Sequence, residues 1–309
     1  MFHRDPRPIA ETVTLSRGRF APSPTGLLHS GSLTTAVGSY LEARVKGGEW
    51  LVRIEDIDPG REIPGAADTI LRTLERLGFE WDGEVVYQSR RHALYRAAFD
   101  RLRRHGYLYP CRCSRRDVQH MAQRGVDGFV YPGTCRTATK PQQEPVAWRL
   151  AIQMEGPVGI NDRLQGDYAQ YLERDVGDIV LLRADGVWAY QFAVVVDDAE
   201  QGVTDIVRGA DLLVSTPRQI GLQRYLQVPT PSYCHLPVMV NNQGEKLSKQ
   251  TLAPAINTGE AVKELSLALA RLGHPPPAIT SIPDLWRWAH AHWSLAKVPS
   301  GPVVIEKLI

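Results

Sequence analysis

The sequence has 309 residues, of which 43% are hydrophobic and 23% charged, and its formal net charge is +2. These proportions exclude a disordered or strongly basic chain, so any nucleic-acid surface must be a local patch. No apolar run reaches the roughly 20 residues that a membrane-spanning helix needs, and residues 1–14 lack the apolar core of a secretory signal. We therefore expect a cytoplasmic protein with a short N-terminal leader and no membrane partner.

The first 60 or so residues follow the order of a nucleotide-binding crossover unit. Leu15–Ala21 is predicted as a strand that ends at a Pro-Ser-Pro-Thr-Gly turn, because prolines cannot continue it. Apolar residues at helical spacing predict a helix over Ser32–Val45, and Trp50–Glu55 is predicted as a second strand. This order indicates an α/β fold with a Rossmann-like parallel sheet.

The middle of the chain is expected to hold an insertion between the two halves of that sheet. Amphipathic helices are predicted over Ala66–Leu77 and Arg90–His105, with Ser89 as the N-cap of the second. The stretch from Tyr107 to Gln143 is rich in cysteine, glycine and proline, so we expect irregular structure there. The expected division is 15–106 and 177–256 for the two catalytic halves, 107–176 for the inserted subdomain and 257–309 for a short helical C-terminal part.

The second half is predicted from apolar runs and turn residues. Val146–Ile152 and Asp178–Ala184 are expected to be strands. Asp185-Gly186 is typical of a hairpin turn, so a return strand is predicted over Val187–Val196. The remaining predictions are a helix that begins at Ser215-Thr-Pro217, a loop over Asn241–Gln250, and helices near Gly259–Leu272 and Pro283–Trp293.

Two segments carry residues suited to nucleotide phosphates. His29-Ser-Gly31-Ser32 stands at the expected start of a helix, where unpaired amides and the helix dipole favour an anion. Lys246-Leu-Ser-Lys249-Gln250 places two lysines near a glycine, and such a lid can neutralise charge on a phosphate in a transition state. Each segment alone fits a structural turn or a solvated loop.

Together and in this order, the two segments resemble the HIGH and KMSKS signatures of the class I aminoacyl-tRNA synthetases. Both depart at the last position, where Ser32 stands for histidine and Gln250 for serine. The resemblance extends from about Gly18 to Pro254, roughly three quarters of the chain, and implies magnesium-bound ATP as a substrate. The segments closest to the glutamyl branch are Arg19-Phe-Ala-Pro-Ser-Pro-Thr-Gly, Leu51-Val-Arg-Ile-Glu55-Asp56-Ile-Asp58, Tyr190-Gln-Phe-Ala and Val207-Arg208-Gly209-Ala-Asp211.

The resemblance implies a glutamate pocket at the carboxyl ends of the parallel strands. Glu55 and Ser23 would bind the ammonium group of glutamate, and Tyr190 would add a hydroxyl donor. Arg19 and Arg208 would bind the side-chain carboxylate, a task that suits the planar guanidinium group. The ATP-binding residues would be His29, Gly31, Ser32 and Lys249, and the residues that stabilise charge in the transition state would be His29, Lys246 and Lys249.

Four further acidic residues near these segments are expected to be structural. Asp56, Asp58, Asp197 and Asp198 would cap turns or pair with Arg53. The alternative for the whole charged set is a group of surface ion pairs, which contribute about 0–1 kcal/mol each.

Three of the four cysteines fall in the expected insertion, in Cys111-Arg-Cys113 and Tyr131-Pro-Gly-Thr-Cys135. In a chain without a secretory signal, such clustering indicates a metal site more than disulfides, although three buried free cysteines remain the alternative. Glutamyl-type synthetases carry a structural zinc at this insertion on the pattern Cys-x-Cys and Tyr-x-x-x-Cys. The resemblance therefore implies Zn²⁺ on Cys111, Cys113, Tyr131 and Cys135, whereas Cys234 is expected in the core, with a fourth-ligand role as its alternative.

A candidate RNA-binding strip lies between Arg101 and Arg116, where six arginines occur without an acidic residue. Such a strip suits a phosphate backbone. The alternative is a solvated helix face on which arginine stems cover apolar surface.

Two features distinguish this chain from full-length glutamyl-tRNA synthetases. Only 60 residues follow Lys249, too few for their helical anticodon-binding part, and Val194 replaces their usual asparagine. Leu33–Tyr40 and Ala189–Asp197 resemble the short paralogues, the glutamyl-Q tRNA(Asp) synthetases. That resemblance implies formation of glutamyl-adenylate without transfer RNA, transfer to queuosine in the anticodon arm of tRNA(Asp), and a monomeric protein.

Three other functions stay open on the sequence. They are a truncated glutamyl-tRNA synthetase that charges tRNA(Glu), a non-catalytic module that binds glutamate or tRNA, and a nucleotidyltransferase of the same fold. The paired lysines argue against simple binding, and a glutamate pocket is superfluous for nucleotidyl transfer.

Overall fold

The centre of the molecule is the crossover unit that the sequence predicts. β1 (Arg17–Phe20), helix α1 (Ser30–Arg44) and β2 (Glu49–Ile54) follow one another, and the two strands pair in parallel. β3 (Val86–Tyr87) adds a short third parallel strand beside β2. The computed structural model describes residues 15–137, 146–245 and 255–305.

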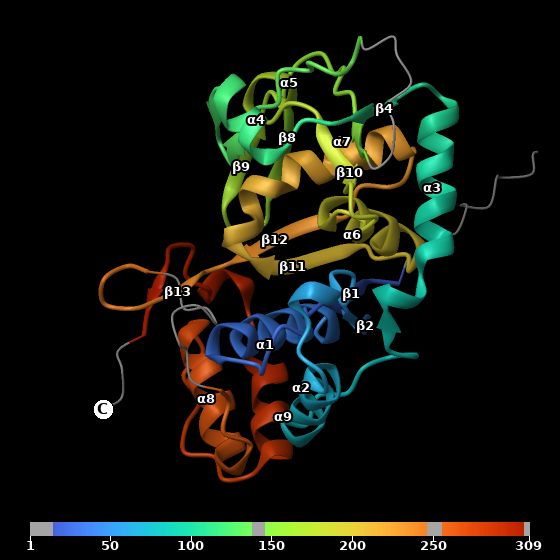
Figure 1. Cartoon of the computed structure of the whole chain (residues 1–309). Helices are drawn as coiled ribbons and strands as arrows, with labels where there is room; N and C mark the ends of the chain where they lie inside the picture. The colour runs from blue at the N-terminus through green and yellow to red at the C-terminus, as the bar shows by residue number, and fades with distance from the viewer. Residues whose placement is uncertain (1–14, 138–145, 246–254, 306–309) are drawn as a thin grey trace, which may run out of the picture.

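Two further strands, β11 (Asp205–Gly209) and β12 (Ser232–Leu236), lie beside β1 in the middle of the molecule (Figure 1). They pair in parallel with each other, and the amide of Thr204, just before β11, donates to the carbonyl of Arg17 at 3.0 Å. Neither strand was predicted. Within each pair the two strands run in one direction, so their carboxyl ends lie together, and open α/β sheets bind ligands at the carboxyl ends of their strands.

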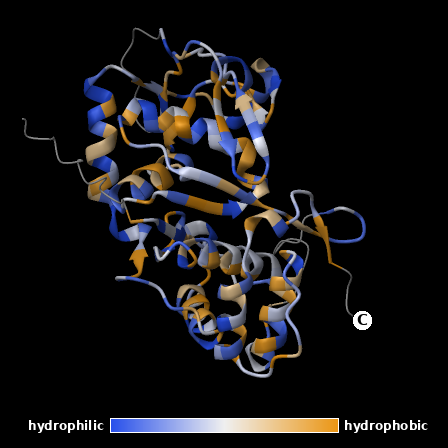
Figure 2. Cartoon of the chain, turned by 180° about the vertical axis from the view of Figure 1, so that it is seen from behind, coloured by the Kyte–Doolittle hydropathy of each residue, from blue (hydrophilic) through white to orange (hydrophobic). Residues whose placement is uncertain are grey.

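Three helices pack around α1 on one side of the sheet (Figure 1). They are α2 (Ala66–Arg76), α8 (Ala261–Arg271) and α9 (Ile282–His292), which confirm the predicted helices within one to two residues. Hydrophobic residues gather on the inner faces of these helices and along the central strands, whereas hydrophilic residues cover the outer faces (Figure 2).

An aromatic cluster joins the C-terminal helices to the sheet. The ring of Tyr40 on α1 lies 5.1 Å from that of Trp50, 5.3 Å from that of Phe79 and 4.9 Å from that of Trp286, measured between centroids. Trp286 Nε1 also donates to the carbonyl of Leu77 at 2.9 Å. Edge-to-face aromatic contacts of this kind add to the stabilisation from burial, so the C-terminal helices are part of the core.

The other side of the sheet is covered by α3 (His92–Arg104), α6 (Tyr190–Glu200) and α7 (Thr216–Leu226), which pack on one another. Helix α3 confirms its prediction, but Ser89 is not its N-cap. Ser89 lies in a short 3₁₀ turn, and its hydroxyl donates to Asp56 at 2.6 Å.

The predicted return strand over Val187–Val196 is wrong. The turn at Asp185-Gly186 forms, and one antiparallel bridge joins Leu182 to Trp188, but α6 then begins at Tyr190. β-Branched residues favour strands, and a helix buried on nearly all sides shows no amphipathic period that would reveal it.

The segment between the two halves of the sheet forms antiparallel structure. β4 (Leu108–Cys111), β7 (Ala147–Leu150) and β10 (Ile179–Leu182) make one sheet, of which β7 and β10 were predicted. β8 (Val158–Asp162) and β9 (Gly166–Gln170) make a hairpin that was not predicted.

The stretch expected to be irregular, from Tyr107 onward, contains more regular structure than predicted. Besides β4 it holds α4 (Arg115–Met121), which begins with a capping box between Ser114 and Asp117.

No helix among the described residues is long and apolar enough to cross a bilayer. The remaining short elements are β5 (Arg124–Gly125), β6 (Gly128–Phe129), α5 (Leu172–Asp175), β13 (Met239–Val240) and β14 (Val303–Val304).

Candidate active site

The parallel strands bring together most of the residues expected to bind glutamate. Arg19 lies on β1, Glu55 directly follows β2 and Arg208 lies on β11, each near the carboxyl end of its strand. Tyr190 opens α6 beside them. Burial raises the pKa of Tyr190 to about 12, the charge of Glu55 adds to this rise, and Arg208 and Arg19 oppose it. These four side chains therefore lie within electrostatic range of one another.

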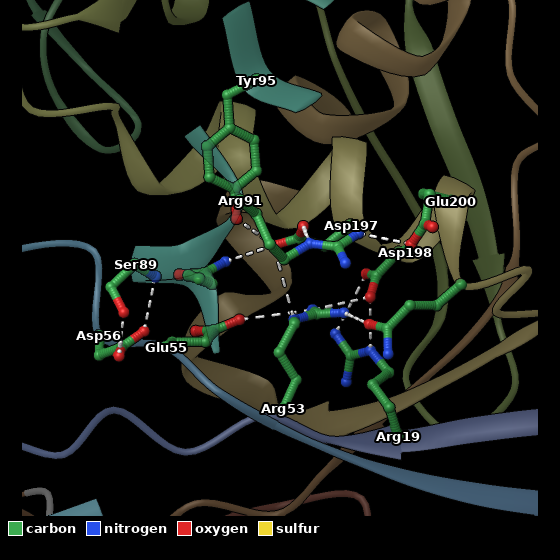
Figure 3. Close-up of polar contacts among 12 residues, drawn as sticks. Arg19, Arg53, Glu55, Asp56, Ser89, Arg91, Tyr95, Asp197, Asp198 and Glu200 are labelled. Atoms are coloured by element: carbon green, nitrogen blue, oxygen red, sulfur yellow. Dashed lines mark hydrogen bonds and ion pairs between the residues drawn. The ribbon is translucent and has the colours of Figure 1, made fainter. Parts of the chain in front are cut away.

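A buried ion-pair network surrounds Arg53 (Figure 3). Its guanidinium group donates to Asp198 at 2.8 Å and to Glu55 at 3.4 Å. Asp198 also accepts from Arg19 Nε at 3.1 Å and from Arg19 Nη2 at 3.4 Å. Asp198 thus holds Arg19 through two of its three guanidinium nitrogens, Nε and Nη2.

Asp197 anchors the same network to neighbouring helices. It accepts from Gln88 Nε2 at 2.7 Å, from Tyr95 Oη at 2.8 Å and from Arg91 Nε at 2.7 Å (Figure 3). The prediction that Asp197 and Asp198 pair with Arg53 is confirmed. Two buried arginines, three buried carboxylates and the partly buried Arg91 form one set, which satisfies the rule that buried charges are paired.

Glu55 is the acidic group of this network whose pKa is raised. Burial raises its pKa to about 7, while Arg53 and Arg19 oppose the rise. The amide of Glu55 donates to the carbonyl of Pro22 at 3.0 Å, which ties the end of β2 to the turn that carries Ser23. Ser23 is exposed at that turn, so both residues expected to bind the ammonium group lie at the same strand end.

Arg208 is buried and has one free end. Nε donates to His235 at 3.1 Å and Nη2 donates to Thr216 at 2.7 Å. Nη1 is buried without a hydrogen-bond partner among the residues that the structure describes. A buried guanidinium nitrogen without an acceptor is costly, so its position indicates a site for an anionic oxygen from a ligand.

His235 and Asp162 stand behind Arg208 and were not predicted as site residues. His235 lies on β12 and Asp162 ends β8, and Nδ1 of the histidine is 2.6 Å from Oδ2 of the aspartate. Both side chains are fully buried. Their contact joins residues 73 positions apart, so no local motif marks it in the sequence.

The turn before α1 carries the expected ATP-binding residues. His29 is the N-cap of α1, and its Nδ1 accepts from the amide of Ser32 at 3.3 Å. The hydroxyl of Ser32 lies 3.1 Å from Nε2 of the same ring, and Gly31 stands between them in the first turn. The first turn contains no acidic residue, which favours an anion there, but a phosphate would compete with His29 for Ser32.

The chain that follows the predicted Asn241–Gln250 loop returns to this turn. Ala255 forms an antiparallel bridge with His29, and the amide of Ile256 donates to the carbonyl of Leu28 at 3.0 Å. Lys246 and Lys249 themselves lie outside the described residues.

The predicted metal ligands form one group. The three sulfur atoms of Cys111, Cys113 and Cys135 lie within 4.8 Å of one another. Tyr131 Oη is 3.3 Å from Cys111 Sγ and 3.4 Å from Cys113 Sγ. Thiolates bound to one tetrahedral zinc at about 2.3 Å stand about 3.8 Å apart, so this donor set fits the ion.

Cys234 belongs to a different part of the structure. It is fully buried on β12 in the core around α1, whereas the cysteine group packs with Tyr109 and Tyr131 in a separate small cluster. Burial raises the pKa of Cys234 to about 12. The core assignment of Cys234 is therefore confirmed over the fourth-ligand alternative.

The arginines between Arg101 and Arg116 do not form one continuous strip. Arg101 donates to the carbonyl of Leu226 at the end of α7, and Arg103 lies over the ring of Trp148. The end of α3 and helix α4 lie on opposite sides of the view, joined by β4 (Figure 1). Arg115 and Arg116 are exposed on α4, so only part of the strip is available there to an RNA backbone.

Val194, which replaces the usual asparagine of full-length synthetases, is 1% exposed. It packs in the hydrophobic core that contains α3 and α6.

Comparisons with known proteins agree with this geometry. The family model described as tRNA synthetases class I (E and Q), catalytic domain, matches residues 16–282. A protein of Chromobacterium violaceum named glutamyl-Q tRNA(Asp) synthetase is 66% identical, covering 94% of this chain and 97% of the relative. A protein of the same name from Neisseria meningitidis is 59% identical, covering 93% of this chain and 98% of the relative. Another from Dechloromonas aromatica is 55% identical, covering 94% of this chain and 97% of the relative.

Two solved structures share the fold. A glutamate tRNA ligase from Elizabethkingia meningosepticum, in complex with its amino acid, has a TM-score of 0.78 at 24% identity and covers 94% of this chain and 67% of its own. The glutamate-tRNA synthetase from Elizabethkingia anophelis has the same TM-score and identity, with 95% and 68% covered. These likenesses concern the arrangement of helices and strands.

Proposed function

This chain belongs to the glutamyl-Q tRNA(Asp) synthetase family of class I synthetases, and we propose that it activates glutamate with ATP and transfers it to queuosine in the anticodon of tRNA(Asp). It is an aminoacyl-tRNA-synthetase-like ligase, with glutamate, ATP and tRNA as partners. The finer steps, the residue roles and the anticodon arm as the acceptor are the proposal.

The single observation that carries the proposal is the buried Nη1 of Arg208, which has no hydrogen-bond partner in the described part of the chain and lies near the strand ends that hold Arg19 and Glu55. We assign the side-chain carboxylate of glutamate to Arg208 and Arg19, since a guanidinium group matches a carboxylate in shape and charge. Glu55 and Ser23 bind the ammonium group, and Tyr190 adds a hydroxyl donor. Glutamine is rejected because it brings no charge to compensate the arginine end.

The chemistry is acyl transfer in two steps. The α-carboxylate of glutamate attacks the α-phosphorus of magnesium-bound ATP in line, and pyrophosphate leaves. His29, Gly31, Ser32 and the amides of α1 position the phosphates, while Lys246 and Lys249 stabilise the developing charge. A hydroxyl of the queuosine cyclopentene ring then attacks the mixed anhydride and releases AMP.

Cys111, Cys113, Tyr131 and Cys135 would hold a structural Zn²⁺. The ion would supply folding energy to a segment with few buried apolar side chains, and it takes no part in either step. We place the subdomain that it stabilises at 107–176, between catalytic segments 15–106 and 177–256, and we expect a monomer, which light scattering would check.

The deciding experiment measures two reactions in one preparation. Glutamate-dependent exchange of pyrophosphate into ATP is followed without RNA, and labelled glutamate is then offered with queuosine-containing and queuosine-free tRNA(Asp). We expect exchange without RNA and label only on the queuosine-containing tRNA. Exchange that requires tRNA(Glu), with label on its 3′ end, would contradict the proposal, as would the absence of exchange with glutamate.

A further inference from the structure

We propose that Asp162 and His235 are positioning residues that hold Arg208 in the orientation that binds the side-chain carboxylate of glutamate. The inference rests on the proposed function of Arg208 and adds to it two buried residues from other elements. They form a continuous chain: Asp162 contacts His235, and His235 contacts Arg208.

The first link is a carboxylate that cannot rotate. Oδ1 of Asp162 accepts from three backbone amides, those of Leu164 at 3.0 Å, Gln165 at 2.9 Å and His235 at 3.1 Å. Three donors on one oxygen leave Oδ2 for Nδ1 of His235, at 2.6 Å. The hydrogen bonds from His235 and from the amides keep the pKa of Asp162 below its usual range, although burial alone would raise it.

The second link is a histidine with one defined tautomer. Because an ionised carboxylate only accepts, Nδ1 of His235 carries the proton and Nε2 presents its lone pair to Nε of Arg208 at 3.1 Å. Burial lowers the pKa of His235, with Asp162 opposing, so the neutral ring is favoured. A proton on Nε2 would instead set two donors against each other.

The third link is the guanidinium group itself. With Nε on His235 and Nη2 on Thr216, both ends that face the protein are fixed, and Nη1 is the nitrogen left for a ligand. The ring of Tyr233 lies 5.4 Å from the guanidinium carbon and limits its movement on a further side. Loss of the acceptor at Nε2 therefore weakens glutamate binding without touching the ATP site.

Asp162 ends the β8 strand of the inserted segment, so the insertion contributes directly to the pocket. The amide of Arg163 donates to the carbonyl of Tyr233 at 3.0 Å, and Gln165 Nε2 donates to the carbonyl of His235 at 2.7 Å. The β8–β9 turn is thus bound to β12 on both sides of the Asp162–His235 contact.

Two substitutions of His235 separate its two contacts. Glutamine places an amide oxygen near the position of Nε2, whereas asparagine reaches only to the position of Nδ1. We expect His235→Asn to raise the KM for glutamate in pyrophosphate exchange by about 10- to 100-fold, the size expected for a lost hydrogen bond to a charged group. His235→Gln should recover most of that loss, and the KM for ATP should stay within about threefold in both.

Asp162→Asn tests the tautomer without a change of size. Its Oδ1 still accepts the three amides, so its amide nitrogen faces His235 and forces Nδ1 to accept and Nε2 to carry the proton. We expect the same rise in the KM for glutamate as for His235→Asn, together with exchanged ¹⁵N shifts of the two ring nitrogens. His274→Asn is the matched control, because His274 is also buried and hydrogen-bonded but lies in the C-terminal part.

All variants are measured at a pH above the pKa of Glu55, with wild-type exchange as the reference. Absence of glutamate-dependent exchange in the wild type would refute the proposed function. With wild-type exchange intact, equal KM values in His235→Asn, Asp162→Asn and the wild type would refute the positioning role. An equal loss in His235→Gln and His235→Asn, with both KM values raised, would also refute it, because that pattern indicates a merely structural histidine.

Discussion

The glutamate pocket and the cysteine group are both polar clusters, but they are held in place differently. The pocket lies between two large hydrophobic cores, where ion pairs hold Arg19 and Arg53 and hydrogen bonds to His235 and Thr216 hold Arg208. Among the residues that the structure describes, the cysteine group packs with only two other buried side chains, those of Tyr109 and Tyr131. From this comparison we expect the pocket to form from protein contacts alone, and the cysteine group to depend on the proposed zinc ion.

Loss of the metal should give the largest effect. We expect Cys113→Ala to abolish zinc binding and to raise amide hydrogen exchange across 108–137, because structural zinc contributes about 10–16 kcal/mol in small domains. Zinc content by elemental analysis and hydrogen exchange by mass spectrometry check this. Cys234→Ala should still bind zinc. Full zinc occupancy in Cys113→Ala would contradict the proposal that the cysteine group holds the metal.

The second largest effect should come from the ion-pair network of the pocket. Its disruption should lower the stability of the whole fold. Arg53→Met leaves Asp197, Asp198 and Glu55 without their shared counter-ion, so we expect the free energy of unfolding to fall by about 3–5 kcal/mol. Urea unfolding measures it. Arg61→Met is the control, since the side chain of Arg61 is 71% exposed in its pair with Asp58 and should contribute about 0–1 kcal/mol. A similar fall in the free energy of unfolding in the two variants would show that burial of the network does not determine its contribution to stability.

A third effect is the pH dependence of glutamate activation. Because the pKa of Glu55 is raised to about 7, its carboxylate is protonated as the pH falls through 7, and attraction for the ammonium group is then lost. We expect kcat/KM for glutamate to decline about tenfold per pH unit below that value. Glu55→Gln should be slow and nearly flat over the same range, and Glu75→Gln should keep the wild-type profile.

The raised pKa of Glu55 has the opposite effect on stability: a rise in pH that favours activity lowers the free energy of unfolding. An acid whose pKa is higher in the folded state than its ordinary 4.5 destabilises the fold as the pH rises from about 4.5 to 7. The free energy of unfolding of Glu55→Gln should therefore fall less than that of the wild type over this range. An identical slope in both proteins would contradict the assignment.

The smallest effect concerns RNA transfer. Arg115→Glu combined with Arg116→Glu should lower glutamate transfer to tRNA about tenfold at low salt and leave pyrophosphate exchange unchanged, because phosphate contacts are electrostatic. Lys263→Glu combined with Arg287→Glu changes the charge equally on the exposed C-terminal helices and serves as the control. Equal loss of exchange and transfer would show that α4 acts on the pocket instead.

Local signals predicted the parts of the fold that local residues determine. The first crossover unit has a Pro-Ser-Pro-Thr-Gly turn before its helix and a Gly-Gly pair after it, and the structure confirms β1, α1 and β2. Helix α6 was predicted as a strand because burial around Val194 and Val196 removes the helical period. β11 and β12 are five-residue strands that mix polar and apolar residues, and their pairing joins distant parts of the chain, so sequence pattern alone does not reveal them.

The candidate site also contains residues that local motifs predicted and residues that only the fold brings together. Arg19, Glu55 and Arg208 were proposed through family motifs, and the structure places them at one edge of the sheet. Asp162 and His235 carry no motif, and their pairing requires a hairpin of the insertion to dock on β12. A buried histidine next to an aspartate becomes informative only once the fold brings the two side chains together.

The contact between β1 and the residue just before β11 has a consequence for synthesis on the ribosome. Arg17 and Thr204 are hydrogen-bonded although 187 positions separate them. At roughly 5–20 residues per second, β11 emerges about 10–40 s after β1, and one edge of β1 stays unpaired meanwhile. An open strand edge invites association with other chains, and the two arginines on this four-residue strand supply the charge that opposes it. Arg19 thus opposes association of the nascent chain before the glutamate pocket has formed.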